Sequence, residues 1–255
     1  MKFALVDGIR KKAEPRGAGV CICCGSDVRA YCGNERIFHW KHVAVEKCDN
    51  WSEGETEWHR TWKNEFDQNY QECVKFDLLT GEKHIADIYL PGKDLVIEFQ
   101  HSPIDINEIL SREHFYRRMI WVVDIERFVT NVTLFSHFGD VYWEFIELPW
   151  AKNQDRLIRQ LKQEGKLAEA ELLRKDKEGW NYLQDFEKRY SNGDFKKDFF
   201  VMTWKYQHKR WNAVQMPLFF DLGDDYLYRS IEPIKVWNGF IVKRYAKQDF
   251  LSHYK

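Results

Sequence analysis

The 255-residue sequence predicts an α/β core between a cysteine-rich N-terminal segment and an α+β C-terminal region. Residues 51–73 carry aromatic side chains every four positions, which is typical of a helix with one buried face. Residues 84–100 alternate apolar and polar side chains around a Pro-Gly turn, which predicts a β-hairpin. Residues 119–124 form the continuous apolar run of a buried strand. With a strand over 74–79 and a helix over 104–118, the predicted order is helix, three strands, helix, strand.

The helix predicted over Trp51–Cys73, with Ser52 as its N-cap, presents two stripes. The first should face the core and consists of Trp58, Trp62, Phe66 and Tyr70. The second places Glu55, His59 and Lys63 four residues apart. This second stripe is either a solvated face with i,i+4 pairing or an acid, a histidine and a lysine that point at the hairpin.

The hairpin places two carboxylates on one face. If Gly92 and Lys93 are the loop residues, Gly92 supplies the positive φ of a primed turn and Asp87 lies directly opposite Glu98. The other face should be buried and consists of Ala86, Ile88, Leu90, Leu95, Ile97 and Phe99. Two like charges side by side repel, and a bound cation removes that repulsion. The alternative is that both carboxylates lie on the solvated face of an edge hairpin.

The ligand type selects the cation. Mg²⁺ or Mn²⁺ prefers oxygen ligands, often one or two carboxylates together with phosphate oxygens. Such an ion can activate water and stabilise the charge of an in-line attack on phosphate. The pair Asp87 and Glu98 therefore predicts a catalytic divalent metal site.

A second metal site is predicted near the N-terminus. Cys21 and Cys24 form a C-x2-C pair, and His39 and His42 form an H-x2-H pair. Two thiolates and two imidazoles make a tetrahedral Zn²⁺ set, which is structural because four protein ligands leave no open position. Two further cysteines are rival ligands, Cys23 and Cys32. The alternative is buried thiols with surface histidines.

The order of elements, with Asp87 on the second strand and Glu-x-Gln on the third, resembles the restriction-endonuclease-like PD-(D/E)xK core. The chain resembles the competence protein CoiA-like family more closely, over about residues 20–125. The residues that carry this resemblance are Cys21, Cys24, residues 39–42, residues 55–59, Lys63, residues 84–87, residues 97–102, Arg112 and Tyr116. The resemblance implies a metal-dependent DNA nuclease preceded by a small zinc-binding segment.

One departure from the family pattern concerns charge. The motif that gives the PD-(D/E)xK core its name has lysine where this chain has Gln100. A glutamine can orient water by hydrogen bonding but supplies no positive charge, which Lys63 could supply from the helix. The helix acid is either Glu55 or Glu57. Glu55 is favoured because it shares a face with His59 and Lys63.

These observations predict three regions: a zinc-binding segment over 1–50, a nuclease core over 51–150 and a C-terminal α+β region over 151–255. The predicted activity is a divalent-metal-dependent deoxyribonuclease that acts in DNA uptake, recombination or defence. The catalytic set comprises Glu55, His59, Lys63, Asp87, Glu98 and Gln100, with Arg112 and Tyr116 as further candidates for contacting phosphate or bracing the site. The alternatives are a catalytically inactive nucleic-acid-binding module, which Gln100 favours, and an interaction scaffold that binds a protein partner through residues 151–255.

Composition limits the partners and the compartment. The formal net charge is −1, so any contact with DNA must come from local basic patches. The first ten residues hold no apolar run fit for a signal peptide, and no stretch approaches the ~20 apolar residues of a membrane span. We therefore expect a cytoplasmic protein whose six cysteines are reduced or bind metal.

Overall fold

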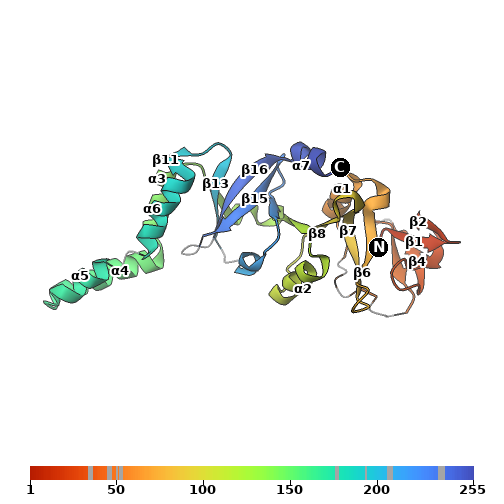
Figure 1. Cartoon of the computed structure of the whole chain (residues 1–255), viewed down its shortest axis with the longest axis horizontal. Coiled ribbons are helices and arrows are strands. Elements are labelled where there is room, and N and C mark those ends of the chain that lie inside the picture. The colour runs from red at the N-terminus through yellow and green to blue at the C-terminus, as the bar shows by residue number, and fades with distance from the viewer. Residues whose placement is uncertain are drawn as a thin grey trace. The chain divides into compact units, whose positions relative to one another are not determined.

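The computed structural model describes residues 1–33, 37–44, 48–49, 51, 54–175, 178–192, 194–205, 209–234 and 239–255. The chain forms two compact units (Figure 1). The first comprises Met1–Ile125, Ala213–Asp224 and Lys247–Lys255, and the second comprises Glu126–Asn212 and Asp225–Ala246. These units do not follow the three predicted regions, because residues 213–224 and 247–255 return to the first unit.

The first unit begins with an antiparallel five-stranded sheet in the order β2-β1-β3-β4-β5. Its strands are β1 (Phe3–Val6), β2 (Ile9–Lys12), β3 (Ala18–Val20), β4 (Asp27–Tyr31) and β5 (His39–His42). Ala4, Val28 and Trp40 form its core together with the buried Cys21 and Cys23. Cysteine side chains therefore lie inside this small sheet domain.

The first unit also holds a mixed sheet in the order β14-β9-β8-β7-β6. Its strands are β6 (Gln71–Phe76), β7 (Lys83–Leu90), β8 (Leu95–Gln100), β9 (Met119–Asp124) and β14 (Leu218–Asp221). β6, β7 and β8 pair antiparallel, whereas β8, β9 and β14 run parallel. The helices of this unit are α1 (Glu57–Asn64), α2 (Ile106–Tyr116) and α7 (Lys247–Tyr254). The mixed α/β architecture agrees with the prediction.

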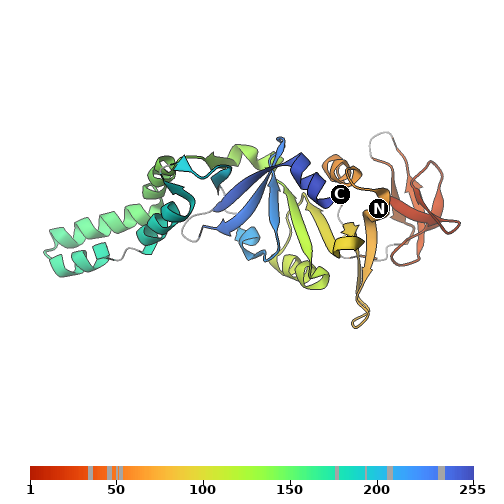
Figure 2. The same ribbon diagram turned by 45° about the horizontal axis from the view of Figure 1, so that its top comes forward.

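Helices cover both faces of this mixed sheet (Figures 1 and 2). On one face Trp62 of α1 stacks on Phe99 of β8 with ring centroids 5.6 Å apart, and meets Phe250 of α7 edge-on at 6.0 Å. On the other face Glu113 of α2 accepts a hydrogen bond from Trp121 Nε1 of β9 at 3.0 Å. The hairpin of β7 and β8 therefore lies between two helical layers.

The predicted register of the hairpin is confirmed, but its turn is different. Ile88 pairs with Ile97, and the latter is fully buried on the predicted apolar face. The connection is a 3₁₀ turn over Pro91–Lys93, and Asp94 rather than Gly92 has the left-handed backbone, with φ of 43°. A four-residue loop built on a right-handed turn needs its positive φ only at its last residue.

Helix α1 is shorter than the predicted Trp51–Cys73. Thr56 is its N-cap and accepts a hydrogen bond from His59 N at 3.3 Å, whereas Ser52 lies outside the described residues. The helix ends at Asn64 with Glu65 as its C-cap, and Asp67 then caps the 3₁₀ turn η1 (Gln68–Tyr70) by accepting from Asn69 N. The residues that follow form strand β6. The four-residue repeat of aromatic side chains therefore predicted a longer helix than the structure contains.

The second unit packs helices on an antiparallel sheet in the order β10-β13-β16-β15. The strands are β10 (Val132–Phe135), β13 (Phe199–Trp204), β15 (Tyr226–Pro233) and β16 (Gly239–Ala246), with a small pair β11 (Ser191–Asn192) and β12 (Asp194–Phe195). The helices are α3 (Phe138–Ile146), α4 (Pro149–Gln163), α5 (Leu167–Lys175) and α6 (Glu178–Tyr190), with 3₁₀ turns η3 (Glu126–Asn131) and η4 (Lys209–Ala213). Val141, Phe145, Phe186, Val201 and Ile241 form its core. Within the described residues, no helix of either unit has the length and apolar character needed to cross a membrane.

Candidate active site and cysteine–histidine cluster

The β7–β8 hairpin opens at the two predicted carboxylates. Its ladder ends at the pair Ile88 and Ile97. Beyond this pair the Asp87 N–H donates to Glu98 Oε1 at 3.2 Å, and the Phe99 N–H donates to Asp87 Oδ2 at 3.0 Å. The Phe99 carbonyl bonds to His59 Nε2. Side chains thus satisfy the backbone groups that would otherwise continue the ladder, so the strands part where the carboxylates lie.

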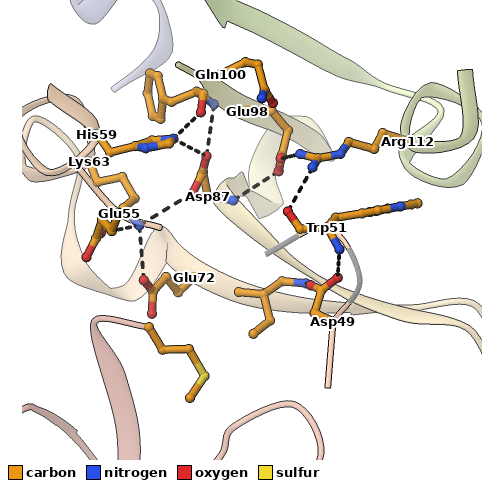
Figure 3. A pocket seen from close by; sticks show the side chains of 13 residues that line it. Asp49, Trp51, Glu55, His59, Lys63, Glu72, Asp87, Glu98, Gln100 and Arg112 are labelled. Carbon is orange, nitrogen blue, oxygen red and sulfur yellow. Dashed lines mark hydrogen bonds and ion pairs between the residues drawn. The ribbon is translucent and has the colours of Figure 1, made fainter. Parts of the chain in front are cut away.

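A cavity of about 90 Å³ lies at this opening (Figure 3). Its lining includes all six residues of the predicted catalytic set, namely Glu55, His59, Lys63, Asp87, Glu98 and Gln100. Arg112 lines it as well, whereas Tyr116 is buried behind it and meets the ring of Trp51 at 5.9 Å. Of the two candidate acids, Glu55 lies in the cavity just before α1, and Glu57 is exposed on the helix.

Lys63 lies among three carboxylates. Its Nζ is 2.6 Å from Glu55 Oε1, 3.1 Å from Glu72 Oε1 and 3.5 Å from Asp87 Oδ1, and only 3% of the residue is exposed (Figure 3). Burial disfavours the ammonium, but the three negative charges outweigh it and raise the pKa of Lys63. The cavity therefore holds a lysine that stays charged.

Asp87 is a stabilised anion of the cavity. Its Oδ2 lies 3.6 Å from His59 Nε2 and accepts from the Phe99 N–H. Burial works against the carboxylate, yet Lys63 and His59 lower its pKa. Reciprocally, burial favours a neutral imidazole, but the bond to Asp87 raises the pKa of His59.

Glu98 has an opposite balance. Its Oε2 lies 3.1 Å from Arg112 Nη1, and its Oε1 accepts from the Asp87 N–H. Burial and the negative charge of Asp87 raise the pKa of Glu98 to about 8, and Arg112 offsets only part of that. The two carboxylates thus differ in proton affinity although they face one cavity. A cation bound to both would reduce this difference.

Gln100 closes the end of β8 that faces the cavity. It is buried, and its Nε2 donates to Ser102 O at 3.0 Å. His101, the next residue, meets His59 edge-on with ring centroids 4.7 Å apart.

Among the cavity residues outside the predicted catalytic set are Glu72, Asp49 and Trp51. Glu72 accepts hydrogen bonds from the backbone N–H of Lys2 and Phe3, at 2.8 and 3.1 Å, as well as from Lys63. The other two, Asp49 and Trp51, precede α1. The overlong helix prediction placed Glu72 on a helix surface. Its left-handed backbone, with φ of 45°, has no sequence signal.

The donor set of the cavity suits a hard divalent cation. Asp87 and Glu98 present oxygen ligands. Each carboxylate is fixed by a backbone N–H of the opposite strand: Asp87 accepts from Phe99, and Glu98 accepts from Asp87. Buried carboxylates with unequal pKa values in one cavity are typical of functional sites. The chemistry of these groups therefore fits Mg²⁺ or Mn²⁺.

A second group of potential ligands lies at the N-terminal sheet. The ligand atoms of Cys21, Cys24, His42 and Cys48 all lie within 4.8 Å of one another. Cys21 Sγ is 3.5 Å from Cys48 Sγ, and Cys24 Sγ is 3.3 Å from His42 Nε2. Sulfur atoms bound to one tetrahedral zinc at about 2.3 Å lie about 3.8 Å apart, so this cluster is close to the required size.

Local backbone geometry builds the first half of the cluster. The Cys23 N–H donates to Cys21 Sγ at 3.3 Å, and the Gly25 N–H donates to Cys21 O at 3.0 Å. Gly25 has φ of +75°, which a residue with a side chain rarely adopts. Burial opposes ionisation of Cys24, but hydrogen bonds from Ser26 and contacts with Cys48 and His42 lower its pKa to about 6. Thiolate character and a tight turn both suit Zn²⁺.

The cluster differs from the predicted ligand set at one position, where Cys48 takes the place of His39. Both histidines lie on strand β5, three residues apart, so their side chains point to opposite faces of the sheet. His39 Nδ1 instead bonds to Ile37 O at 2.8 Å, and its ring stacks on Tyr31. The rival cysteines Cys23 and Cys32 pack against the sheet core and are not among the four clustered ligands.

Comparison with protein families matches residues 77–173 to the family described as competence protein CoiA, nuclease-like domain. The match includes Asp87, Glu98, Gln100 and Arg112, whereas the cysteine–histidine cluster and α1 precede it. No curated protein and no solved structure matches the chain. The match confirms the resemblance that the motifs carry: residues 77–173 are similar to the nuclease-like domain of the CoiA-like family.

Proposed function

We propose that this chain is a divalent-metal-dependent deoxyribonuclease with a restriction-endonuclease-like PD-(D/E)xK core. The observation that carries the proposal is the opened hairpin, where Asp87 and Glu98 line one cavity beside the charged Lys63. The nuclease-like domain matched by residues 77–173 supports the same class of reaction. Roles in DNA uptake, recombination or defence are all consistent with this activity.

In this proposal Asp87 and Glu98 hold Mg²⁺ or Mn²⁺ through their oxygen atoms. When bound, the ion would lower the pKa of water and offset charge on the phosphate under attack. Lys63 keeps a positive charge 3.5 Å from Asp87, where it would offset the negative charge of the phosphate. The amide of Gln100 orients the attacking water. Glu55 fixes Lys63 at 2.6 Å, and His59 fixes Asp87.

The cysteine–histidine cluster would hold zinc as a structural ion. Cys21, Cys24, His42 and Cys48 supply four ligands of the types that zinc prefers and leave no position for water or substrate. The two proposed sites therefore take different metals for different reasons: soft thiolates for zinc, hard carboxylates for magnesium or manganese.

The direct test incubates the full chain with single-stranded DNA, double-stranded DNA and RNA in the presence of Mg²⁺, Mn²⁺ or a chelator. We expect cleavage of DNA with Mg²⁺ or Mn²⁺, lost in Asp87→Ala. The matched control is Asp94→Asn, in the same hairpin but outside the cavity, where the carboxylate contacts Tyr89 and Lys75. Full cleavage by an Asp87→Ala, Glu98→Ala double variant would place the active site elsewhere.

A nucleic-acid-binding module without turnover is the second candidate, and one contact favours it. Arg112 is bonded to Glu98 at 3.1 Å, so a cation must compete with a buried guanidinium for that carboxylate. Gln100 also stands where the family motif has lysine. DNA retention in a gel-shift assay, without cleavage under any of the metals, would favour this candidate.

A further inference from the structure

A short stretch of chain lies between the cysteine–histidine cluster and the cavity. The thiol of Cys48 belongs to the cluster, and the next residue, Asp49, lines the cavity together with Trp51. Two other contacts join the same regions: Met1, which lines the cavity, lies 3.6 Å from Cys21 Sγ through its Sδ, and Lys83 Nζ of β7 donates to Cys23 O at 2.7 Å. Cys48 and Asp49 differ from these because they are adjacent in the chain. This proximity raises the question of what Asp49 and Trp51 do.

Asp49 is tied to strand β7, which carries Asp87. Its Oδ1 lies 2.8 Å from His84 Nδ1 and accepts from the Trp51 N–H at 3.0 Å, and its Oδ2 accepts from the Ile85 N–H at 2.8 Å. The side chain of Asp49 is only 5% exposed. Ile85 lies two residues before Asp87 on the same strand, so Asp49 fixes the backbone of β7 beside the proposed metal ligand.

Trp51 is tied to the carboxylate of strand β8. Its carbonyl accepts from Arg112 Nη2 at 2.9 Å, and Arg112 Nη1 lies 3.1 Å from Glu98 Oε2 (Figure 3). The ring of Trp51 stacks on His84 with an interplanar angle of 11°. Arg112 is therefore oriented from one side by Trp51 and from the other by Glu98, with both Nη groups occupied.

We infer that the ion in the cysteine–histidine cluster sets the geometry of the proposed nuclease site through Asp49 and Trp51, which act as positioning residues. A metal bond to the Cys48 thiolate fixes the residue next to Asp49. Without the ion, three thiols and an imidazole have no common partner, and the stretch that anchors β7 and Arg112 gains conformational freedom. The effect on cleavage rests on the proposed nuclease activity, whereas the effect on the hairpin rests only on the proposed zinc site.

The test uses hydrogen–deuterium exchange of the full chain, zinc-loaded and zinc-stripped, with metal content measured in each sample. We expect zinc removal to speed amide exchange in residues 83–100 and zinc addition to restore protection. Strands β13 and β16 of the second unit should not change and serve as an internal reference. Faster exchange confined to residues 1–42, with 83–100 unchanged, overturns the inference.

Asp49→Asn separates the anchor from the cluster. It replaces the charged acceptor and leaves all four cluster ligands in place, so we expect normal zinc content. Amide exchange in residues 83–100 should be fast in this variant, and zinc removal should not speed it further. The control is Asp77→Asn, whose carboxylate likewise accepts from two backbone N–H groups, of Leu79 and Thr80, at the β6–β7 turn. That control should leave exchange in 84–100 as in the wild type. If Asp49→Asn does not fold, the comparison of wild-type protein with and without zinc still decides the outcome.

Cleavage assays on the same samples distinguish this inference from the proposed function. Asp49→Asn should slow cleavage about 10- to 100-fold, the range typical of residues that orient metal ligands. A wild-type protein that does not cleave DNA contradicts the proposed function, and exchange alone then decides the coupling. A wild-type protein that cleaves, with Asp49→Asn equally fast and its hairpin equally protected, overturns the coupling and leaves the proposed function standing.

Discussion

The two candidate metal sites of the first unit are built on different electrostatics. In the cavity, the carboxylates of Asp87 and Glu98 already have protein cations beside them, Lys63 and Arg112. In the cysteine–histidine cluster, the four potential ligand atoms crowd within 4.8 Å of one another. Burial and hydrogen bonds with the neighbouring Cys24 and Cys21 raise the pKa of Cys48.

The difference indicates which of the two sites should need its metal to keep its structure. In the cavity, the charged side chains of Lys63 and Arg112 balance the carboxylates of Asp87 and Glu98, so its structure should depend little on a bound ion. The described contacts of the cluster join thiols and an imidazole to one another rather than to side chains of opposite charge, so its order should depend on zinc. We therefore expect removal of magnesium to abolish activity alone, and removal of zinc to alter structure.

The largest expected effect is on zinc binding, and the two histidines of β5 provide a matched pair. His42→Ala removes a cluster ligand and should lower zinc content well below one per chain. Zinc in small finger domains contributes about 10–16 kcal/mol of apparent binding energy, so the N-terminal sheet should melt earlier. Elemental analysis and thermal melts measure both effects.

His39→Ala is the control for that variant. Its imidazole bonds to Ile37 O on the opposite face of the strand, so zinc content should remain near that of the wild type. Equal zinc loss in the two variants would show that both histidines reach the ion, as the H-x2-H spacing alone suggested.

The second expected effect is on catalysis. Asp87→Ala and Glu98→Ala should each reduce metal-dependent DNA cleavage by about 10³-fold or more, and the double variant should lose little beyond either one, because the two residues act as one unit. The fold should survive in Asp87→Ala, because Lys63 keeps Glu55 and Glu72 as partners. Circular dichroism beside the cleavage assay separates lost activity from lost structure.

The success of sequence reasoning also differs between the two sites. Asp87 and Glu98 could be placed on one face because alternating burial fixes which face each residue of a hairpin takes, whereas their direct opposition depended on the choice of turn residues. Cys48 could not be found, because its distance from the C-x2-C pair follows no standard ligand spacing. Strand parity could have excluded His39, since residues three apart on a strand never share a face.

The other features that the sequence did not predict also depend on contacts between distant residues. Glu72, the second residue of β6, has a left-handed backbone that a glutamate does not predict, and its side chain bonds to Lys63. The return of residues 213–224 and 247–255 to the first unit depends on long-range packing. One example is Asp221, which accepts from Trp62 Nε1 at 2.9 Å. Local pattern therefore predicted six residues that line the cavity, and it missed Glu72 and the contacts that depend on distant parts of the chain.

A smaller effect is expected from Glu72→Gln, which leaves Lys63 with two carboxylates. Glu72 is buried and accepts from the Lys2 and Phe3 N–H groups, so the variant should lose about 1.5–3 kcal/mol of stability, the usual value for hydrogen bonds to a charged group. Chemical denaturation at pH 7 measures this difference.

The pH dependence of that difference has a definite sign. Burial alone would raise the pKa of Glu72, but Lys63 and the backbone N–H groups lower it below its ordinary value of 4.5. A group whose pKa is lowered by folding stabilises the protein above its unfolded pKa, and this contribution disappears as the pH falls through the folded value. The stability gap between wild type and Glu72→Gln should therefore narrow below about pH 4.5. A gap that widens on acidification would contradict the ion pair with Lys63.

The smallest expected effect comes from Gln100→Lys, which gives the chain the lysine of the family motif. The new ammonium would enter a cavity that already holds Lys63, but that lysine is surrounded by Glu55, Glu72 and Asp87 and is electrostatically satisfied. Repulsion between the two ammonium groups should therefore be weak, and the loss of the bond to Ser102 O should cost little.

We expect Gln100→Lys to change the cleavage rate by less than about tenfold, which corresponds to less than about 1.4 kcal/mol of the barrier. Gln100→Ala is its companion, because it removes the amide without adding charge. If lysine abolishes cleavage while alanine preserves it, the second positive charge is the harmful element and Lys63 already fills the cationic role. If both abolish it, the amide itself orients the reacting water. If lysine raises the rate far above that of the wild type, the missing charge limits this enzyme, and the cavity is less well balanced than the comparison with the cysteine–histidine cluster implies.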